Sequence, residues 1–139
     1  MEKEIGSEKK FDHELGKIVV GTVNKRDCKS VYVRLECYVK PEVSLESSIA
    51  LIRGRFIANQ YQVSRTYFEG LKSTIIDYRF PETKIKDKPN KVSFITIEMT
   101  LLANDVFCYD KDFIFTARMF GDTMFTLLDS IDGIEIVMK

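Results

Sequence analysis

The 139-residue chain has no tryptophan, one histidine, three prolines and three cysteines. No apolar run approaches the roughly 18 residues that a membrane span needs. Residues 1–10 are charged and lack the apolar segment of a secretory signal. The cysteines, Cys28, Cys37 and Cys108, form no Cys-x-x-Cys pair. These absences argue against a membrane protein and a disulfide scaffold, and they predict a cytoplasmic domain with reduced, packed thiols.

Residues that commonly carry catalysis are also scarce. His13 is the only histidine and lies in a charged N-terminal segment, so no zinc-protease helix with two histidines can form. Neither common glycine-rich phosphate-binding motif occurs. Asp105, Asp110 and Asp112 lie close in sequence but lack the spacing and the glycine of a calcium loop. The sequence therefore predicts no enzyme, no metal site and no cofactor, with His13 as a solvated surface residue.

Net charge is absent too, because 21 Lys and Arg balance 21 Asp and Glu. The balance is uneven along the chain. Residues 18–90 carry thirteen basic side chains against eight acidic ones, whereas residues 91–139 carry four against eight. Segregated charge can steer a partner even when the total is zero. If the fold mixes the two segments on one surface, the charges cancel, and the sequence leaves both alternatives open.

The chain does have the composition of one globular domain. Apolar residues make up 45% of it and charged residues 30%, which is typical of a folded protein. A chain of this length can bury roughly two-thirds of its surface. Residues 1–15 are mostly charged, with Phe11 and Leu15 as their anchors, and are expected to form a flexible arm. Residues 16–139 are expected to form a single β-rich domain.

Two segments alternate apolar and polar side chains, which is the period of a half-buried strand. The apolar faces are Val31, Val33, Leu35, Cys37 and Val39 in the first segment, and Ile95, Ile97, Met99 and Leu101 in the second. Pro41 should end the first strand. Further strands are expected at residues 18–23, 73–80, 113–120 and 134–138, a short piece at residues 106–109, and polar loops at residues 24–27 and 84–91.

Residues 44–58 fit either a helix or a strand. As a helix, they carry one apolar stripe of Leu45, Ile49, Ile52 and Phe56. Ser44 would then be the N-cap. Gly54 is unfavourable inside a helix. A strand over residues 48–58, paired with residues 31–40, is therefore the favoured prediction.

One helix is expected near the C-terminus, over residues 122–131, with Asp122 as its N-cap and Gly133 just past its end. Its apolar stripe is Met124, Leu127, Leu128 and Ile131. Residues 59–72 lack periodicity and indicate a loop. Strands dominate and do not alternate with helices, so the predicted fold is mostly β (α+β). It is an antiparallel sheet or a partly open OB-like barrel with one short covering helix.

Aromatic and basic residues interleave along the middle of the chain. Such mixtures bind single-stranded nucleic acid, because the rings stack on bases and the cations pair with phosphates. Pairing of residues 31–40 with residues 48–58 would gather several of them on one sheet surface. The candidate binding residues are Tyr32, Arg34, Tyr38, Lys40, Arg53, Arg55, Tyr61, Arg65, Tyr67 and Arg79. The sequence thus suggests a non-enzymatic module that binds single-stranded nucleic acid.

The same residues also have a plainer explanation. Tyr and Phe favour strands in any sheet protein, and Arg and Lys solvate outer faces. The alternative is a protein-interaction or oligomer-forming β domain that has no nucleic-acid ligand. The apolar strand expected at residues 134–138 could offer an open sheet edge to a second copy, so a homo-oligomer is expected.

Overall fold

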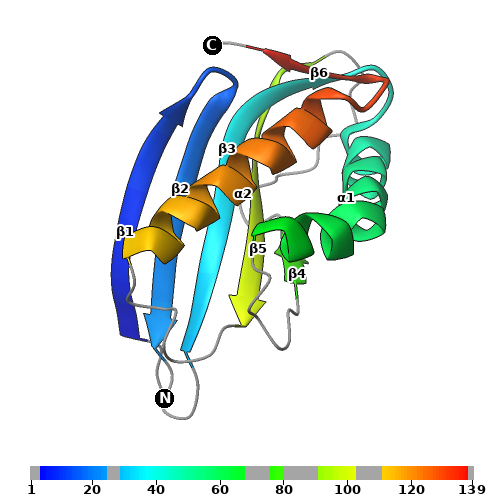
Figure 1. Ribbon diagram of the computed structural model, residues 1–139. Helices are drawn as coiled ribbons and strands as arrows, with labels where there is room; N and C mark the ends of the chain where they lie inside the picture. The colour runs from blue at the N-terminus through cyan, green and yellow to red at the C-terminus, as the bar shows by residue number, and fades with distance from the viewer. Residues whose placement is uncertain (1–3, 25–28, 68–75, 80–90, 103–110, 138–139) are drawn as a thin grey trace.

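The computed structural model describes residues 4–24, 29–67, 76–79, 91–102 and 111–137 (Figure 1). Its elements are β1 (Glu4–His13), β2 (Gly16–Asn24), β3 (Lys29–Pro41), α1 (Leu45–Tyr67), β4 (Ile76–Arg79), β5 (Ser93–Leu102), α2 (Lys111–Asp129) and β6 (Ile134–Val137). The strands form one antiparallel sheet in the order β1-β2-β3-β5-β4, with β6 beside β3. Both helices cover the same face of this sheet (Figure 1).

Strand β3 organises the sheet because it pairs on both of its edges. Its partner on one edge is β5, over Ser30 to Val39. On the other edge β2 pairs as far as Glu36, and β6 takes over from Tyr38 to Pro41. The antiparallel sheet predicted from the alternating segments is thus confirmed. Its described strands run in a line from β1 to β4, so the sheet is open and is not an OB-like barrel.

The hydrophobic core lies between the sheet and the two helices. The predicted apolar faces of β3 and β5 supply Val33, Leu35, Cys37, Val39, Ile95, Ile97 and Met99, all buried. On the helical side of the core, α1 contributes Leu45, Ile49, Ile52 and Phe56, and α2 contributes Ala117, Phe120, Met124, Phe125 and Leu128. The opposite face of the sheet is left without a covering layer among the described residues. This second face is called the open face below.

Helix α1 corrects the favoured strand over residues 48–58 and the loop expected from residue 59. The apolar stripe at helical spacing decides the structure, since Ile52 and Phe56 are completely buried. Ser44 is the N-cap, as in the helical alternative: its Oγ accepts a hydrogen bond from the Ser47 backbone N–H at 3.0 Å. Burial of four large side chains outweighs the helix cost of one glycine, roughly 1 kcal/mol.

Helix α2 corrects two further predictions. It starts at Lys111, so residues 113–120 are helical and Asp122 lies in mid-helix. The β-branched and aromatic residues before Gly121 suggested a strand, but the apolar stripe already begins at Ala117. The fold therefore has two helices where one was predicted. Gly133 does end this region, with a φ of +89° that favours glycine, and β6 follows as predicted.

The first strand occupies most of the expected flexible arm. Residues 4–13 form β1, which pairs with β2 from Glu4↔Asn24 to His13↔Gly16. Phe11 packs against the core. Strand β4 falls within the strand predicted at residues 73–80. The short piece expected at residues 106–109 and nearly all of the loop at residues 84–91 lie outside the described residues.

Candidate functional site

The open face holds part of the predicted nucleic-acid surface. Tyr32, Arg34, Tyr38 and Lys40 alternate with the buried residues of β3 and lie on this face, as the sequence predicts. Arg53 and Arg55 do not join them, because they are exposed on α1 in the helical layer. The expected sheet platform that combined the two groups is therefore not formed.

Of the remaining predicted binding residues, three lie on α1 and one lies on β4. Tyr61, Arg65 and Tyr67 belong to the last turns of α1, not to a sheet surface. Arg79 ends β4, where it is the strand partner of Glu98. Their side chains lie outside the described part of the structure. Four of the ten candidates have described side chains on the open face, and the register places the position of Arg79 on the same side of the sheet as Glu98.

Arg34 is surrounded by carboxylates on the open face. Its Nε donates a hydrogen bond to Glu36 at 2.9 Å, and its terminal nitrogens lie 3.6 Å from Glu8 and 3.7 Å from Glu98. Burial acts to lower the pKa of Arg34, but the hydrogen bond to Glu36 and the nearby carboxylates outweigh it and raise that pKa. One cation thus faces three carboxylates, and the cluster has no excess positive charge for a phosphate.

Tyr32 is held against the sheet beside this cluster. Its hydroxyl donates a hydrogen bond to Glu8 on β1. The ring lies over Gly21 of β2, where even a Cβ atom would collide with it. Burial first, and then the hydrogen bond and charge of Glu8, raise the pKa of Tyr32 to about 12. A ring that is buried and tied down in this way has little surface for stacking on a base.

Charge over the rest of the open face is balanced. By strand register, Lys10, Asp12, Lys17, Lys40 and Glu135 lie on this face with the Arg34 cluster. Among the described side chains, Lys10, Lys17, Arg34 and Lys40 are therefore matched by Glu8, Asp12, Glu36, Glu98 and Glu135. Four cations thus face five carboxylates among the described side chains, so this face has no excess of positive charge.

The far end of the open face combines apolar side chains with a buried hydroxyl that has no hydrogen-bond partner in the described structure. Tyr38 of β3 pairs with Phe94 of β5 in the register, and their rings lie 5.1 Å apart. Phe94 keeps part of its ring exposed. Thr96 is buried nearby on β5, and its hydroxyl has no hydrogen-bond partner in the described structure. This region offers a little apolar surface and one buried orphan hydroxyl.

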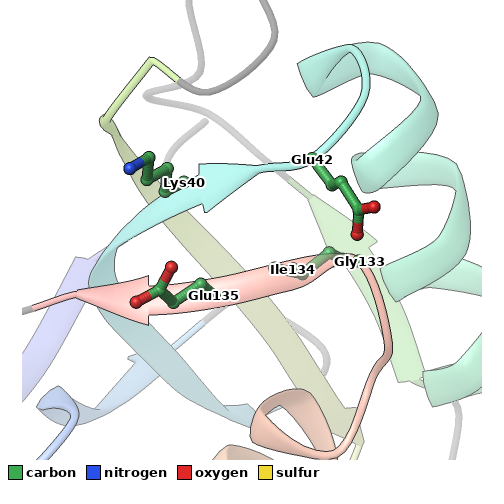
Figure 2. A pocket seen from close by; sticks show the side chains of 5 residues that line it. All are labelled: Lys40, Glu42, Gly133, Ile134 and Glu135. Atoms are coloured by element: carbon green, nitrogen blue, oxygen red, sulfur yellow. The ribbon is translucent and has the colours of Figure 1, made fainter.

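A shallow depression lies where β3 and β6 meet (Figure 2). It measures about 240 Å³ and is lined by Lys40, Glu42, Gly133, Ile134 and Glu135. The backbone N–H of Glu42 donates to the Gly133 carbonyl at 2.8 Å, which fixes the wall. Ligand pockets typically enclose about 300–1,000 Å³ and bury most of their ligand. This depression is smaller, and its walls are held by structural hydrogen bonds.

His13 is a structural contact and not the solvated residue that the sequence predicts. Its side chain is only 12% exposed and stacks on Phe125 at 4.5 Å. Nδ1 accepts a hydrogen bond from the Leu15 backbone N–H at 3.0 Å. Nε2 therefore carries the proton and donates it to Asp122 at 2.6 Å. Nδ1 thus holds the ring within the β1–β2 turn, and Nε2 and the ring stacking fasten this hairpin to α2.

The helical layer exposes large apolar side chains that the sequence analysis did not single out. Leu51 and Ile57 on α1 are 49% and 50% exposed, and Phe115 and Met119 on α2 are 58% and 43% exposed. Each pair lies on the outward side of its helix, away from the buried stripe. The helical wheels of residues 45–67 and 111–129 contain this signal, but only once both segments are known to be helices.

The described residues show no other site. None of their helices is both long and apolar enough to cross a membrane. No three of their His, Cys, Asp or Glu side chains gather as metal ligands. Comparison with known proteins found no matching family, curated protein or solved structure. Any functional argument therefore rests on the two surfaces of this fold.

Proposed function

We propose that this protein is a non-enzymatic interaction module that binds protein partners through the outward faces of its two helices. One observation carries the proposal: four large apolar side chains, Leu51, Ile57, Phe115 and Met119, are about half exposed on one layer. A surface helix normally presents polar and charged residues to water. Apolar residues grouped on an exposed face mark contact surfaces, because covering them removes apolar area from water.

The stripe on α2 is the simpler of the two faces. Phe115 and Met119 are one turn apart and therefore neighbours. The same helix is anchored below by Phe120 and Phe125, both fully buried, so its position on the sheet is fixed. A fixed helix that carries an exposed aromatic and a flexible thioether resembles the anchors of protein interfaces. The partner expected here has an apolar groove or helix.

Single-stranded nucleic acid remains the second candidate ligand. Tyr38 and Lys40 keep exposed surface on the open face, and Arg53 and Arg55 are exposed on α1. Three features favour the protein partner instead. Arg34 is met by three carboxylates, the ring of Tyr32 is buried, and the open face is balanced in charge. A nucleic-acid surface needs a net excess of cations along the phosphate path.

Photo-crosslinking tests the role of α2. A benzoylphenylalanine placed at position 115 should give one defined covalent adduct on irradiation in the cells that make the protein. The same residue placed at Lys17, which is exposed on the open face, is the matched control and should give none. Met119→Asp should abolish the adduct from position 115. Equal, diffuse labelling from both positions would contradict the proposal.

A further inference from the structure

Strand β1 is the longest strand of the sheet that has a single described partner. It has ten residues and pairs with β2 alone among the described strands, and Figure 1 shows it as the outermost strand. Strands β4 and β6 also have one described partner, but each has four residues. An edge of this length presents a row of backbone N–H and C=O groups to which another strand can hydrogen-bond.

The β1–β2 hairpin decides which backbone groups of β1 point to the free edge. A two-residue turn joins His13 to Gly16, and these two residues face each other in a register that is regular back to Glu8. In such a hairpin the closing pair exchanges both of its backbone hydrogen bonds, and every second pair along the ladder does the same. The intervening residues turn their backbone N–H and C=O groups away from β2. These residues are Glu8, Lys10 and Asp12.

The side chains of these three residues lie on the open face and alternate in charge along the edge. Charged side chains commonly protect an edge by repelling a second strand, but alternating charges can also match those of a partner. Glu8 is already bound by the Tyr32 hydroxyl and lies 3.6 Å from Arg34. Lys10 and Asp12 are exposed and have no ion-pair partner among the described side chains. One cation and one carboxylate are therefore free at the edge.

We infer that two copies of the chain pair through their β1 edges, antiparallel about a two-fold axis at Phe11, with Lys10 of each copy opposite Asp12 of the other. Charge complementarity identifies the occupant as a second copy, because this register forms the same favourable pair twice on one face of a continuous sheet. The neighbouring register sets Lys10 against Lys10 and Glu8 against Asp12, so like charges disfavour it. A register that sets Glu8 against Lys10 uses a carboxylate that Tyr32 already binds.

The helical side of the same register is complementary as well. Phe11 is partly buried, and the guanidinium of Arg118 lies 4.7 Å from the centre of its ring. At the axis this ring faces its own copy in a pair without backbone hydrogen bonds, where side chains approach most closely. Lys9 faces His13 of the second copy, which is hydrogen-bonded to the carboxylate of Asp122. The register therefore covers apolar surface and brings a cation towards an acidic side chain.

Sedimentation of charge-reversed full chains tests the interface and its register. The chain of 16.1 kDa should sediment as a dimer at high micromolar concentration. Lys10→Asp sets carboxylates against each other on both sides of the axis and should weaken association by at least about tenfold. Adding Asp12→Lys restores opposite charges and should restore the dimer. Lys40→Asp reverses an exposed charge on β3 and should leave the dimer intact. A strict monomer, a dimer unaffected by Lys10→Asp, or a loss that Asp12→Lys does not repair would overturn the inference.

Amide hydrogen exchange identifies the paired backbone groups without relying on a substitution. In the dimer the N–H groups of Lys10 and Asp12 donate to the second copy, so their exchange should slow as the protein concentration rises. The N–H of Phe11 bonds β2 and should exchange slowly at every concentration. A dimer that leaves the amides of Lys10 and Asp12 unprotected would place its interface elsewhere, and protection that appears only with another protein would indicate a foreign strand. Either result would overturn the inference, while adducts of another protein from position 115 would still support the role of α2.

Discussion

At the scale of single residues, the burial of the Thr96 hydroxyl is energetically unfavourable. Its hydroxyl is buried on β5 with no hydrogen-bond partner in the described structure. Thr96→Val keeps the branched shape and removes the orphan hydroxyl, so the free energy of unfolding should rise by about 1 kcal/mol. Urea unfolding followed by circular dichroism measures the change. Thr126→Val is the control: it removes an exposed hydroxyl that bonds the Asp122 carbonyl and should change stability by less than about 0.5 kcal/mol. A loss of stability at position 96 would mean that its hydroxyl has a partner.

Cys37 links burial to stability at alkaline pH. Burial raises the pKa of its thiol from the ordinary 9.0 to about 12. The folded state therefore holds this proton where the unfolded state has lost it. The resulting stability is complete below pH 9 and is lost as pH rises towards 12. Cys37→Ala should accordingly show a smaller fall in stability between pH 9 and 12 than the natural chain, even if its stability at pH 7 is lower. Parallel curves for the two proteins over that range would contradict the assignment.

Reactivity of the same thiol tests its burial independently. The sequence predicts a packed, reduced Cys37, and the structure confirms a free, buried cysteine. In the background of Cys28→Ser and Cys108→Ser, a disulfide reagent should label the native protein slowly and the urea-unfolded protein at once. Cys28 and Cys108 lie outside the described residues, so their expected behaviour stays a prediction. Rapid labelling of native Cys37 would show that the β3 face opens readily.

At the scale of elements, the β1–β2 hairpin is fastened to α2 through His13. The imidazole bonds Asp122 and stacks on Phe125. His13→Ala should lower the free energy of unfolding by about 1–2 kcal/mol, since it removes a hydrogen bond and a ring contact. A double-mutant cycle with Asp122→Ala should give a coupling of roughly 0.5–1 kcal/mol. Additive effects of the two changes would mean that the pair contributes nothing to stability.

The N-terminus of α1 has its own test. Ser44 caps the helix by accepting the Ser47 N–H. Ser44→Ala should therefore cost about 1 kcal/mol, and Ser44→Asp should retain most of the stability because aspartate also caps. Chemical unfolding of the three proteins gives the order. Equal losses for alanine and aspartate would show that the hydroxyl contact does not stabilise α1.

The two helices also show where sequence reasoning fails. The strands at residues 31–39 and 92–102 were predicted correctly, because among regular structures only a β-strand alternates apolar and polar side chains with a period of two. Residues 48–58 were misassigned because a local rule about Gly54 was given more weight than the stripe of four apolar residues. Residues 113–120 were misassigned because Phe and Ile favour strands when taken alone. In both segments, burial against the rest of the fold decided the secondary structure. The propensities of single residues do not include the free energy of that burial.

The arrangement of the candidate site was only partly predictable, for a related reason. Alternation along β3 correctly placed Tyr32, Arg34, Tyr38 and Lys40 on one face. It could not show that Glu8 of β1 and Glu98 of β5 would lie beside Arg34, because those contacts depend on strand order.

At the scale of the whole molecule, the response of binding to salt tests the nucleic-acid hypothesis. The open face is balanced in charge and Arg34 is neutralised, so we expect a labelled single-stranded oligonucleotide to bind weakly at about 50 mM salt. Fluorescence anisotropy measures this binding. Arg34→Ala should leave any residual affinity and its salt slope unchanged, whereas Arg53→Ala with Arg55→Ala should reduce both. Tight binding of the oligonucleotide, with a salt slope that Arg34→Ala flattens, would favour the nucleic-acid hypothesis over the protein partner. Such a result would mean that phosphate displaces the carboxylates around Arg34.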